Sequence, residues 1–290
     1  MNSRILLTGA TGFFGRNLLK SISSLGIEVD VLVRAGKKVS FSSGDLISNV
    51  IEISNLFTQD PLWYESLCKN YTTVIHLAWH IEPGNYESNM NIESLIGSLS
   101  LAYGARKAGV KKFVSIGTCL EYEITTEKLC VNNSLLKPAT LYGASKLSFY
   151  YVLSKLFNTQ ENNFLWCRLF YLLPDKNEEI SSERKMSLAQ YIRTNLSENK
   201  IVFLTSGTQV KDYLHVRDAA DMVAKAIFQN KIGAINICSG ISRTVREIAE
   251  EIALEYGRPE LLKFGEIPKQ ENVSDYIVGV KDPFFSLNGN

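Results

Sequence analysis

Short apolar runs alternate with longer mixed stretches along the first two thirds of the chain. The runs have the length and composition of buried β-strands, and the stretches between them are long enough to form helices. This alternation predicts a parallel sheet with helices on both faces, which is a doubly wound α/β fold. The runs expected to be strands span residues 4–8, 28–33, 50–53, 73–78, 112–116 and 164–169.

The remaining chain is less regular, but helix ends and loops can still be recognised. Gly26 can end the first helix, and Gly109 follows a long helical stretch. Polar and charged residues from 174 to 185 are typical of a mobile segment or lid, where substrate specificity would reside. Further expected helices span 87–108, 216–229 and 245–256, and further expected strands span 201–204 and 234–237.

The composition excludes several classes of partner. The 290 residues are 45% hydrophobic, enough for a large core. With 31 Lys and Arg against 30 Asp and Glu, there is no electrostatic reason to expect nucleic acid or a membrane surface. The first strand leaves no room for a signal peptide, and no apolar run approaches the ~20 residues of a membrane helix. We expect a cytoplasmic protein whose partners are small molecules or copies of itself.

The cysteines and histidines give no pattern of metal ligands. The five cysteines are scattered without a close pair, which argues against a disulfide framework and a zinc site. His76 and His80 are four residues apart, but a strand over 73–78 would not place them on one helical face. No metal is expected.

A glycine-rich segment directly follows the first expected strand. Its glycines let the backbone turn sharply and approach a pyrophosphate, while the next helix offers free N–H groups and the positive end of its dipole. A tight turn without a ligand is the alternative. The position at the start of the first strand–helix unit favours a Rossmann-type dinucleotide site. Its expected coenzyme contacts are Gly9, Thr11, Gly12, Phe13, Phe14 and Gly15.

Arg34 ends the second expected strand, where an acidic residue would bind the adenosine ribose of NAD. An arginine presents a planar, permanently charged fork to phosphate oxygens, and Lys37 and Lys38 follow it. We therefore expect NADPH or NADP in preference to NAD, with a solvated basic loop as the alternative. Asn55 and Leu56 are expected to flank the adenine.

Tyr142 and Lys146 are four residues apart in an expected helix, so they share one face. An ammonium near the phenol would lower the pKa of the tyrosine and make it a usable proton donor or acceptor. This spacing is common by chance, but Thr118 and the glycine turn precede it in the chain. The combination indicates a nicotinamide-dependent active site.

Several motifs in this order resemble the extended short-chain dehydrogenase/reductase superfamily, in the branch that acts on nucleotide sugars. The resemblance covers most of the chain. We expect a Rossmann domain over residues 1–168, to which segments around 201–238 return, and a mainly substrate-binding lobe over 169–290. The motifs are TGATGFFG at 8–15, HLA at 76–78, SIGT at 115–118, Tyr142 with Lys146, and KDYLHVRD at 211–218.

The resemblance implies roles for the reacting groups. Tyr142 would be the general acid/base at the reacting sugar oxygen, Thr118 would hydrogen-bond that oxygen, and Lys146 would hold the nicotinamide ribose. Hydride delivery to a carbonyl builds an alkoxide, which needs a proton donor and an adjacent hydrogen bond. Leu77 and Ala78 would line the coenzyme site.

Two further residues are expected on the substrate side. Asn91 corresponds to a family position that supports the catalytic network, although a capping or packing role fits it equally. Lys211 stands where nucleotide-sugar epimerases carry an arginine for the substrate diphosphate, and a solvent-facing lysine is the alternative. Tyr171 replaces a family asparagine, so no sugar contact is transferred to it.

The local sequence favours one of three reactions of this branch. Dehydratases follow the active-site threonine with Asp-Glu, whereas Thr118 is followed by Cys119 and Leu120, and Glu121 lies one position too late. Epimerases hold NAD tightly, which Arg34 disfavours. We expect an NADPH-dependent reductase of a CDP- or dTDP-linked 4-keto-6-deoxyhexose, similar to enzymes that make deoxysugar donors for O-antigen lipopolysaccharide. A 4-epimerase with tightly bound NAD and a non-catalytic dinucleotide-binding regulator are the alternatives.

A homodimer is expected because family members commonly pair through two helices, here around residues 90–108 and 142–157. The apolar residues on these helices could equally belong to the intramolecular core. They include Leu95, Leu99, Leu147 and Leu153.

Overall fold

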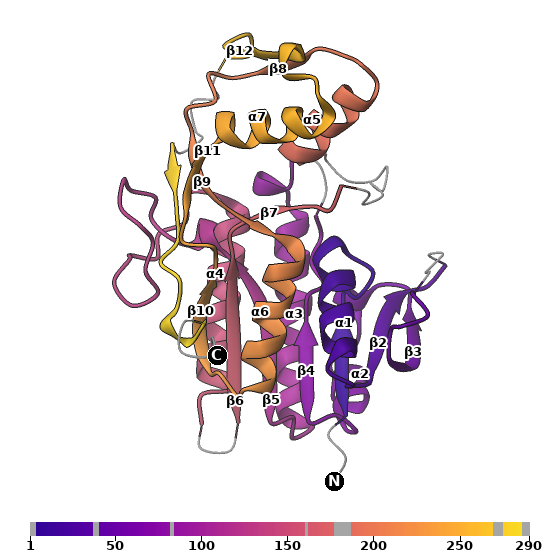
Figure 1. Cartoon of the computed structure of the whole chain (residues 1–290). Helices are drawn as coiled ribbons and strands as arrows, with labels where there is room; N and C mark the ends of the chain where they lie inside the picture. Colours follow the sequence, from indigo (N-terminus) through magenta and orange to yellow (C-terminus); the bar gives the residue numbers. More distant parts are fainter. Residues whose placement is uncertain are drawn as a thin grey trace.

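The computed structural model describes residues 4–36, 41–81, 84–159, 162–176, 187–268 and 275–285. A sheet with helices on both faces forms the main body, and a smaller lobe lies at one end of it (Figure 1). No helix in these ranges is both long and apolar enough to cross a membrane.

The main sheet consists of seven parallel strands, β1 Ile5–Thr8, β2 Val29–Arg34, β3 Ile47–Ile53, β4 Thr73–His76, β5 Lys112–Thr118, β6 Asn163–Leu169 and β10 Gly233–Ile237. Their order is β10-β6-β5-β4-β1-β2-β3. The chain therefore changes direction across the sheet between β1 and β4, and the carboxyl ends of the strands at such a point are the usual place for ligands in doubly wound sheets. The expected doubly wound α/β fold is confirmed.

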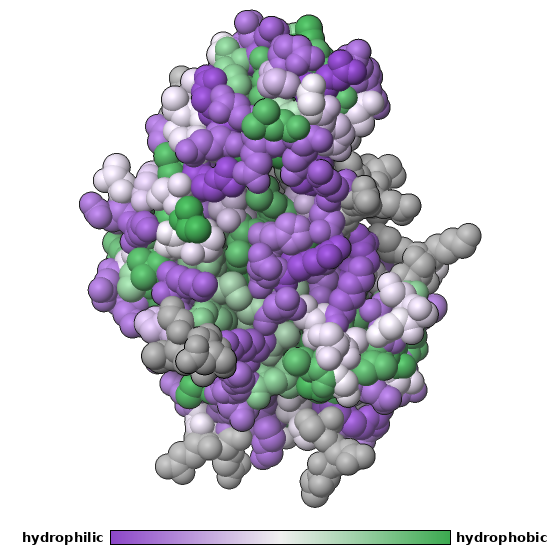
Figure 2. Space-filling model, viewed as in Figure 1, coloured by the Kyte–Doolittle hydropathy of each residue, from purple (hydrophilic) through white to green (hydrophobic). Residues whose placement is uncertain are grey.

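Five helices cover this sheet, α1 Phe13–Ser24, α2 Pro61–Cys68, α3 Met90–Lys107, α4 Leu141–Leu156 and α6 Val216–Phe228. Helices α1 and α6 pack on one face, and α2, α3 and α4 pack on the other (Figure 1). Apolar positions at helical spacing make the contact in α6, which buries Ala220, Val223 and Ile227. The outer surface on the side of α1 and α6 is mostly hydrophilic, with scattered hydrophobic residues (Figure 2).

The smaller lobe contains α5 Leu188–Ser197, β7 Tyr171–Leu173, β8 Val202–Leu204, β9 Val210–His215, β11 Ser242–Thr244, α7 Val245–Tyr256, β12 Leu262–Phe264 and β13 Tyr276–Ile277. Strand β9 pairs with β7, β11 and β13, and β8 pairs with β12. The buried Asp212 carboxylate of β9 accepts hydrogen bonds from the backbone N–H groups of Ser239, Gly240 and Gly279. This carboxylate ties the lobe to the chain that leaves β10.

The predicted elements agree with the structure to within a few residues. Helix α7 has its predicted bounds, and Gly26 and Gly109 adopt positive φ just after α1 and α3. Of the segments expected to return to the first domain, α6 and β10 lie on the main sheet, whereas β8 and β9 lie in the lobe. The mobile segment expected at 174–185 lies outside the described residues from 177 onward.

His76 links the first strand to the helices behind the sheet. Its Nδ1 lies 2.7 Å from the Thr8 hydroxyl, and its Nε2 lies 2.8 Å from the Ser98 hydroxyl. The Thr8 hydroxyl also accepts from the Ala78 N–H at 3.4 Å. Burial, and then the charge of Lys146, lower the pKa of His76 to about 3. The folded protein therefore holds this imidazole neutral.

Protonation of His76 should destabilise the fold as the pH falls. The imidazole has an ordinary pKa of 6.5 in the unfolded chain and about 3 in the fold, so its contribution is complete above pH 6.5 and is lost toward pH 3. At pH 5 the loss is about 2 kcal/mol. Urea unfolding between pH 5 and 7.5 should show a shallower pH dependence for His76→Gln than for the wild type. The control is His215→Gln, at a partly exposed ring, and equal slopes for His76→Gln and wild type would contradict this prediction.

Candidate active site

The glycine turn lies at the carboxyl end of β1, packed against the segment that leaves β4. Gly9 has φ +75°, and a Cβ there would lie 2.7 Å from the Ala78 backbone nitrogen. A Cβ on Gly15 would collide with the Gly9 carbonyl oxygen, which also accepts from the Gly12 N–H at 3.1 Å. Side chains are therefore excluded at Gly9 and Gly15, and the turn consists of closely packed backbone at these positions.

Helix α1 begins directly after this turn, with Gly12 at the N-cap and no side chain that caps it. The first N–H groups of a helix carry partial positive charge and bind anions. A close-packed glycine turn followed by this helix fits a dinucleotide pyrophosphate. The predicted coenzyme residues that meet here are Gly9, Thr11, Gly12, Phe13, Phe14, Gly15, Leu77 and Ala78.

The predicted adenosine contacts lie further along the same edge of the sheet. Arg34 ends β2 and is exposed, whereas Leu56 is buried. The Asn55 Oδ1 accepts from the Phe57 N–H at 2.9 Å and so caps a short 3₁₀ helix. Lys37 and Lys38 lie outside the described residues. The contacts of Arg34, Asn55 and Leu56 with a coenzyme stay predictions.

Thr118 and Tyr142 are brought together from two elements. Thr118 ends β5, Tyr142 lies in the first turn of α4, and the two side chains are close enough for Thr118 to affect the pKa of the phenol. Burial and the neighbouring Tyr86 raise the pKa of Tyr142 above its ordinary value, while Thr118 opposes the rise. The phenol therefore keeps its proton at neutral pH.

Lys146 lies one turn after Tyr142 and is buried. Its Nζ donates to the Ile116 carbonyl at 2.9 Å and lies 3.8 Å from the centre of the Trp79 ring system. Burial lowers the pKa of Lys146 to about 7, and the charge of Glu121 opposes this. Burial dominates at the phenol and raises the pKa of Tyr142, and a lowering of that pKa by Lys146 stays a prediction.

Glu121 and Arg168 form a completely buried ion pair beside Thr118. The Glu121 Oε2 lies 2.6 Å from the Arg168 Nε, and both residues are at most 1% exposed. The same carboxylate accepts from the Trp166 Nε1 at 3.1 Å and from the Thr118 backbone N–H at 2.8 Å. Burial raises the pKa of Glu121, and Arg168 lowers it. The sequence pattern gave no sign of this partner, which is 47 residues away.

Asn91 lies behind the reacting groups, in the first turn of α3. Its Oδ1 accepts from the Trp79 Nε1 at 2.9 Å, and its Nδ2 donates to the Ser88 carbonyl at 2.9 Å. Trp79 was not among the residues that the sequence singled out, because a tryptophan after a strand is more often part of a core. Direct contact of Asn91 with substrate stays a prediction.

Lys211 is only 4% exposed, so the solvent-facing alternative is wrong. Its Nζ lies 5.4 Å from the centre of the Tyr171 ring. On the other side of the site, the rings of Tyr86 and Tyr142 are 6.1 Å apart. Among the described residues, no group of three or more His, Cys, Asp or Glu side chains could hold a metal ion.

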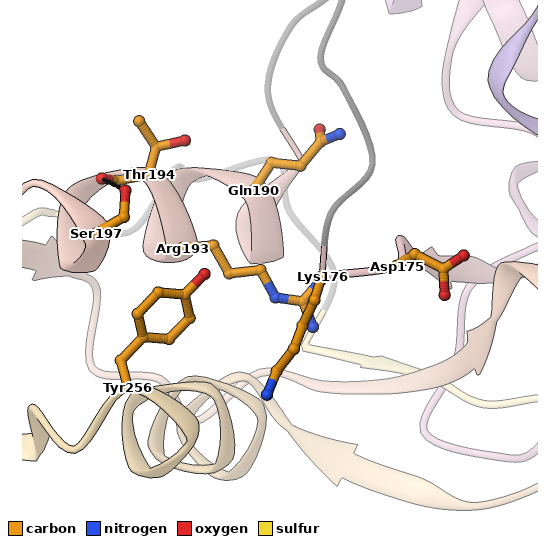
Figure 3. Close-up of a pocket in the computed structure, with 7 residues that line it drawn as sticks. All are labelled: Asp175, Lys176, Gln190, Arg193, Thr194, Ser197 and Tyr256. Carbon is orange, nitrogen blue, oxygen red and sulfur yellow. Dashed lines mark hydrogen bonds between the residues drawn. The ribbon is translucent and has the colours of Figure 1, made fainter.

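A separate polar cavity of about 130 Å³ lies between α5 and α7 in the lobe. Arg193 and Tyr256 reach into it from the two helices, and Lys176 extends toward α7 (Figure 3). The Arg193 Nη1 donates to the Pro174 carbonyl at 2.7 Å, and the Lys176 Nζ lies 3.3 Å from a Glu255 oxygen. These contacts tie the chain after β7 to both helices.

Comparison with known proteins agrees with this arrangement. The profile of the NAD dependent epimerase/dehydratase family matches residues 5–238. The chain is 24% identical to dTDP-6-deoxy-L-talose 4-dehydrogenase (NAD(+)) of Aggregatibacter actinomycetemcomitans, over 96% of this chain and 99% of that one. It is also 24% identical to UDP-glucose 4-epimerase of Streptomyces lividans, over 89% and 83%.

A solved structure shows the same fold over nearly the whole chain. The UDP-glucose 4-epimerase of Thermus thermophilus in complex with NAD superimposes with a TM-score of 0.81 at 21% identity, covering 99% of this chain and 93% of that one. The fold and the glycine turn are typical of the extended short-chain dehydrogenases/reductases, a class of enzymes that use nicotinamide dinucleotides. The chain belongs to the NAD dependent epimerase/dehydratase family.

Removal of the Glu121 charge should destabilise the protein strongly. Glu121→Gln would leave the Arg168 guanidinium buried without its counter-ion, which costs about 3–5 kcal/mol. Glu123→Gln is the matched control, because its pair with Lys137 is largely exposed to solvent and contributes little to stability. Urea unfolding at pH 7.5 compares the two variants. Similar small losses for both would show that the buried pair does not stabilise the fold.

Proposed function

We propose that this protein reduces the 4-keto group of a nucleotide-linked 4-keto-6-deoxyhexose, with a CDP- or dTDP-sugar as substrate and NADPH as reductant. The observation that carries the proposal is the placement of Thr118, at the end of β5, beside Tyr142 and Lys146 of α4, at the edge of the sheet that holds the glycine turn. The product would be a deoxysugar donor for surface polysaccharide such as O-antigen.

The residues divide the work of this reduction. A dihydronicotinamide, when bound at the glycine turn, would supply the hydride for the C4 carbon of the sugar. Tyr142 gives its proton to the C4 oxygen, and the raised pKa of the phenol keeps that proton in place until charge develops. Thr118 donates a hydrogen bond to the same oxygen. Lys146 holds the nicotinamide ribose.

The chemistry of one relative supports this reaction. This relative is named as a 4-dehydrogenase of a dTDP-linked 6-deoxyhexose, and the two chains match over almost their full lengths. Oxidation at C4 of such a sugar gives the 4-keto-6-deoxyhexose, so the proposed reduction is the reverse of that reaction. This favours the dTDP-sugar within the proposed pair of substrates.

Dehydration is disfavoured by the position of Glu121. A dehydratase needs an acid and a base next to the active-site threonine, but this carboxylate is completely buried against Arg168 and Trp166. A 4-epimerase that recycles tightly bound NAD is the second candidate. It is supported by the relatives named UDP-glucose 4-epimerase.

NADPH is proposed over NADH because of Arg34. This side chain is exposed at the end of β2, where a 2′-phosphate would be read. One relative and several solved structures carry NAD in their names, which is the opposing observation. Lys211 is proposed to contact the substrate diphosphate as a buried point charge.

A homodimer is proposed through α3 and α4. The leucines Leu147 and Leu153 are buried within the chain, and Leu95 and Leu99 pack against the same core. Other apolar side chains of α3 and α4, each at least 40% exposed, would contact the second copy. They are Ile92, Ile96, Tyr103, Tyr151 and Val152.

The reaction can be tested by the loss of NADPH absorbance with CDP-, dTDP-, GDP- and UDP-linked 4-keto-6-deoxyhexoses. We expect rapid oxidation with one of them, and a kcat lower by about 10²–10⁴-fold in Tyr142→Phe, which keeps the ring but lacks the proton. Tyr150→Phe, on the same helix, is the control. Interconversion of a 4-hydroxy nucleotide sugar without added coenzyme would replace the reductase by the epimerase.

The role of Arg34 can be tested in the same assay. Loss of a charge-assisted contact to a 2′-phosphate should raise the KM for NADPH by about tenfold or more in Arg34→Ala and leave the KM for NADH unchanged. Lys20→Ala, at an exposed position of α1, is a comparison for general loss of positive charge. A wild-type enzyme that prefers NADH, or an equal effect of Arg34→Ala on both coenzymes, would refute the assignment.

A further inference from the structure

We propose that Trp79 is a positioning residue for Lys146: its indole face covers one side of the ammonium and leaves the remaining N–H groups directed at the nicotinamide ribose. This proposal rests on the coenzyme site described above, but not on the identity of the sugar. Trp79 is the third residue after β4, in the segment that packs against the glycine turn.

The geometry around the ammonium leaves few directions open. The Lys146 Nζ donates to the Ile116 carbonyl at 2.9 Å and lies 3.8 Å from the Trp79 ring centre. An ammonium has three N–H groups, of which one is used by the carbonyl. The face of the indole attracts the positive charge of the ammonium. Among aromatic side chains, tryptophan is the strongest cation–π partner. A ligand hydroxyl is left as partner for the remaining side.

Trp79 is held in place from behind. Its Nε1 donates to the Asn91 Oδ1 at 2.9 Å, and Asn91 is 1% exposed. The Asn91 Nδ2 is itself fixed on the Ser88 carbonyl at 2.9 Å. The chain Ser88–Asn91–Trp79–Lys146 therefore runs from the start of α3 to the ammonium. Through this chain of contacts Asn91 would support the catalytic network, which is the role predicted from its position in the sequence.

The other groups around Lys146 do not replace the indole. His76 is neutral in the fold, and Glu121 interacts with the lysine only at longer range, because its carboxylate is bonded to Arg168, Trp166 and the Thr118 backbone. Burial strongly disfavours an ammonium that lacks compensation. Trp79 offers that compensation without a negative charge that would compete with the coenzyme phosphates.

Coenzyme affinity tests this proposal without any sugar. The Kd for NADPH and for NADH is measured by the fluorescence of the dihydronicotinamide with Trp79→Leu and Trp79→Phe. Both lack the N–H, but only phenylalanine keeps an aromatic face. We expect Trp79→Leu to raise the Kd of the preferred coenzyme by about tenfold and Trp79→Phe by less than about threefold. Asn91→Ala should give an intermediate loss, and Trp63→Leu, on α2, should give none.

A double-mutant cycle separates positioning from packing. If Trp79 acts through the ammonium, Trp79→Leu should change the Kd by less than about twofold in a Lys146→Met background. An equal Kd for the leucine and phenylalanine variants, or an undiminished loss in that background, would reduce Trp79 to a core residue and overturn the proposal. The phenylalanine and Asn91→Ala variants keep the test valid if the leucine variant fails to fold. A sugar assay that fails while these affinities behave as expected would refute the proposed substrate only.

Discussion

The buried carboxylate of Glu121 determines the position of Thr118 at the end of β5. It gathers three donors from two neighbouring strands, the Thr118 N–H at the end of β5 and the Trp166 and Arg168 side chains of β6. A charge in this position is tolerated only when such partners surround it, so the three donors fix one another. The Thr118 backbone is thereby fixed, and its hydroxyl can be offered to Tyr142.

The space around this ion pair is equally restricted. A Cβ on Gly117 would collide with the Trp166 indole nitrogen and the Glu121 carboxylate, so the residue before Thr118 must lack a side chain. The Arg168 guanidinium lies 5.0 Å and 4.8 Å from the ring centres of Tyr122 and Tyr150. An arginine cannot give up its charge, and so Glu121 remains its counter-ion rather than a base for the substrate.

Local patterns were sufficient to predict the main sheet, because strands buried on both faces read as apolar runs and the helices between them end at glycines such as Gly26. The lobe was less predictable, since a three-residue strand such as β11 carries too few positions for a period. The Thr118, Tyr142 and Lys146 set was predicted from the Tyr–Lys spacing, from its place after the glycine turn and from the family resemblance, and its catalytic role stays a prediction. Contacts such as Glu121 with Arg168 were not, because they depend on which strands become neighbours.

Helix α3 shows why the contacts behind the site could not be predicted from the sequence. Its buried positions include Asn91, Ser94 and Ser98, which hydrogen-bond Trp79, the His80 backbone and His76 respectively. Its exposed positions include Ile92 and Ile96. In the first half of α3 these polar groups thus face inward and two apolar groups face outward, whereas the second half buries Leu101, Ala102 and Ala105 as an ordinary surface helix does.

The polar residues in the first half of α3 face inward because the irregular segment after β4 has backbone and ring nitrogens that need hydrogen-bond partners. The outward apolar residues have no such reason within one chain, which is an argument for a second copy there. If a partner covers that face, the helix that supports Trp79 and His76 is fixed from both sides. Dimer formation would then stabilise the coenzyme side of the active site through Asn91 and Ser98.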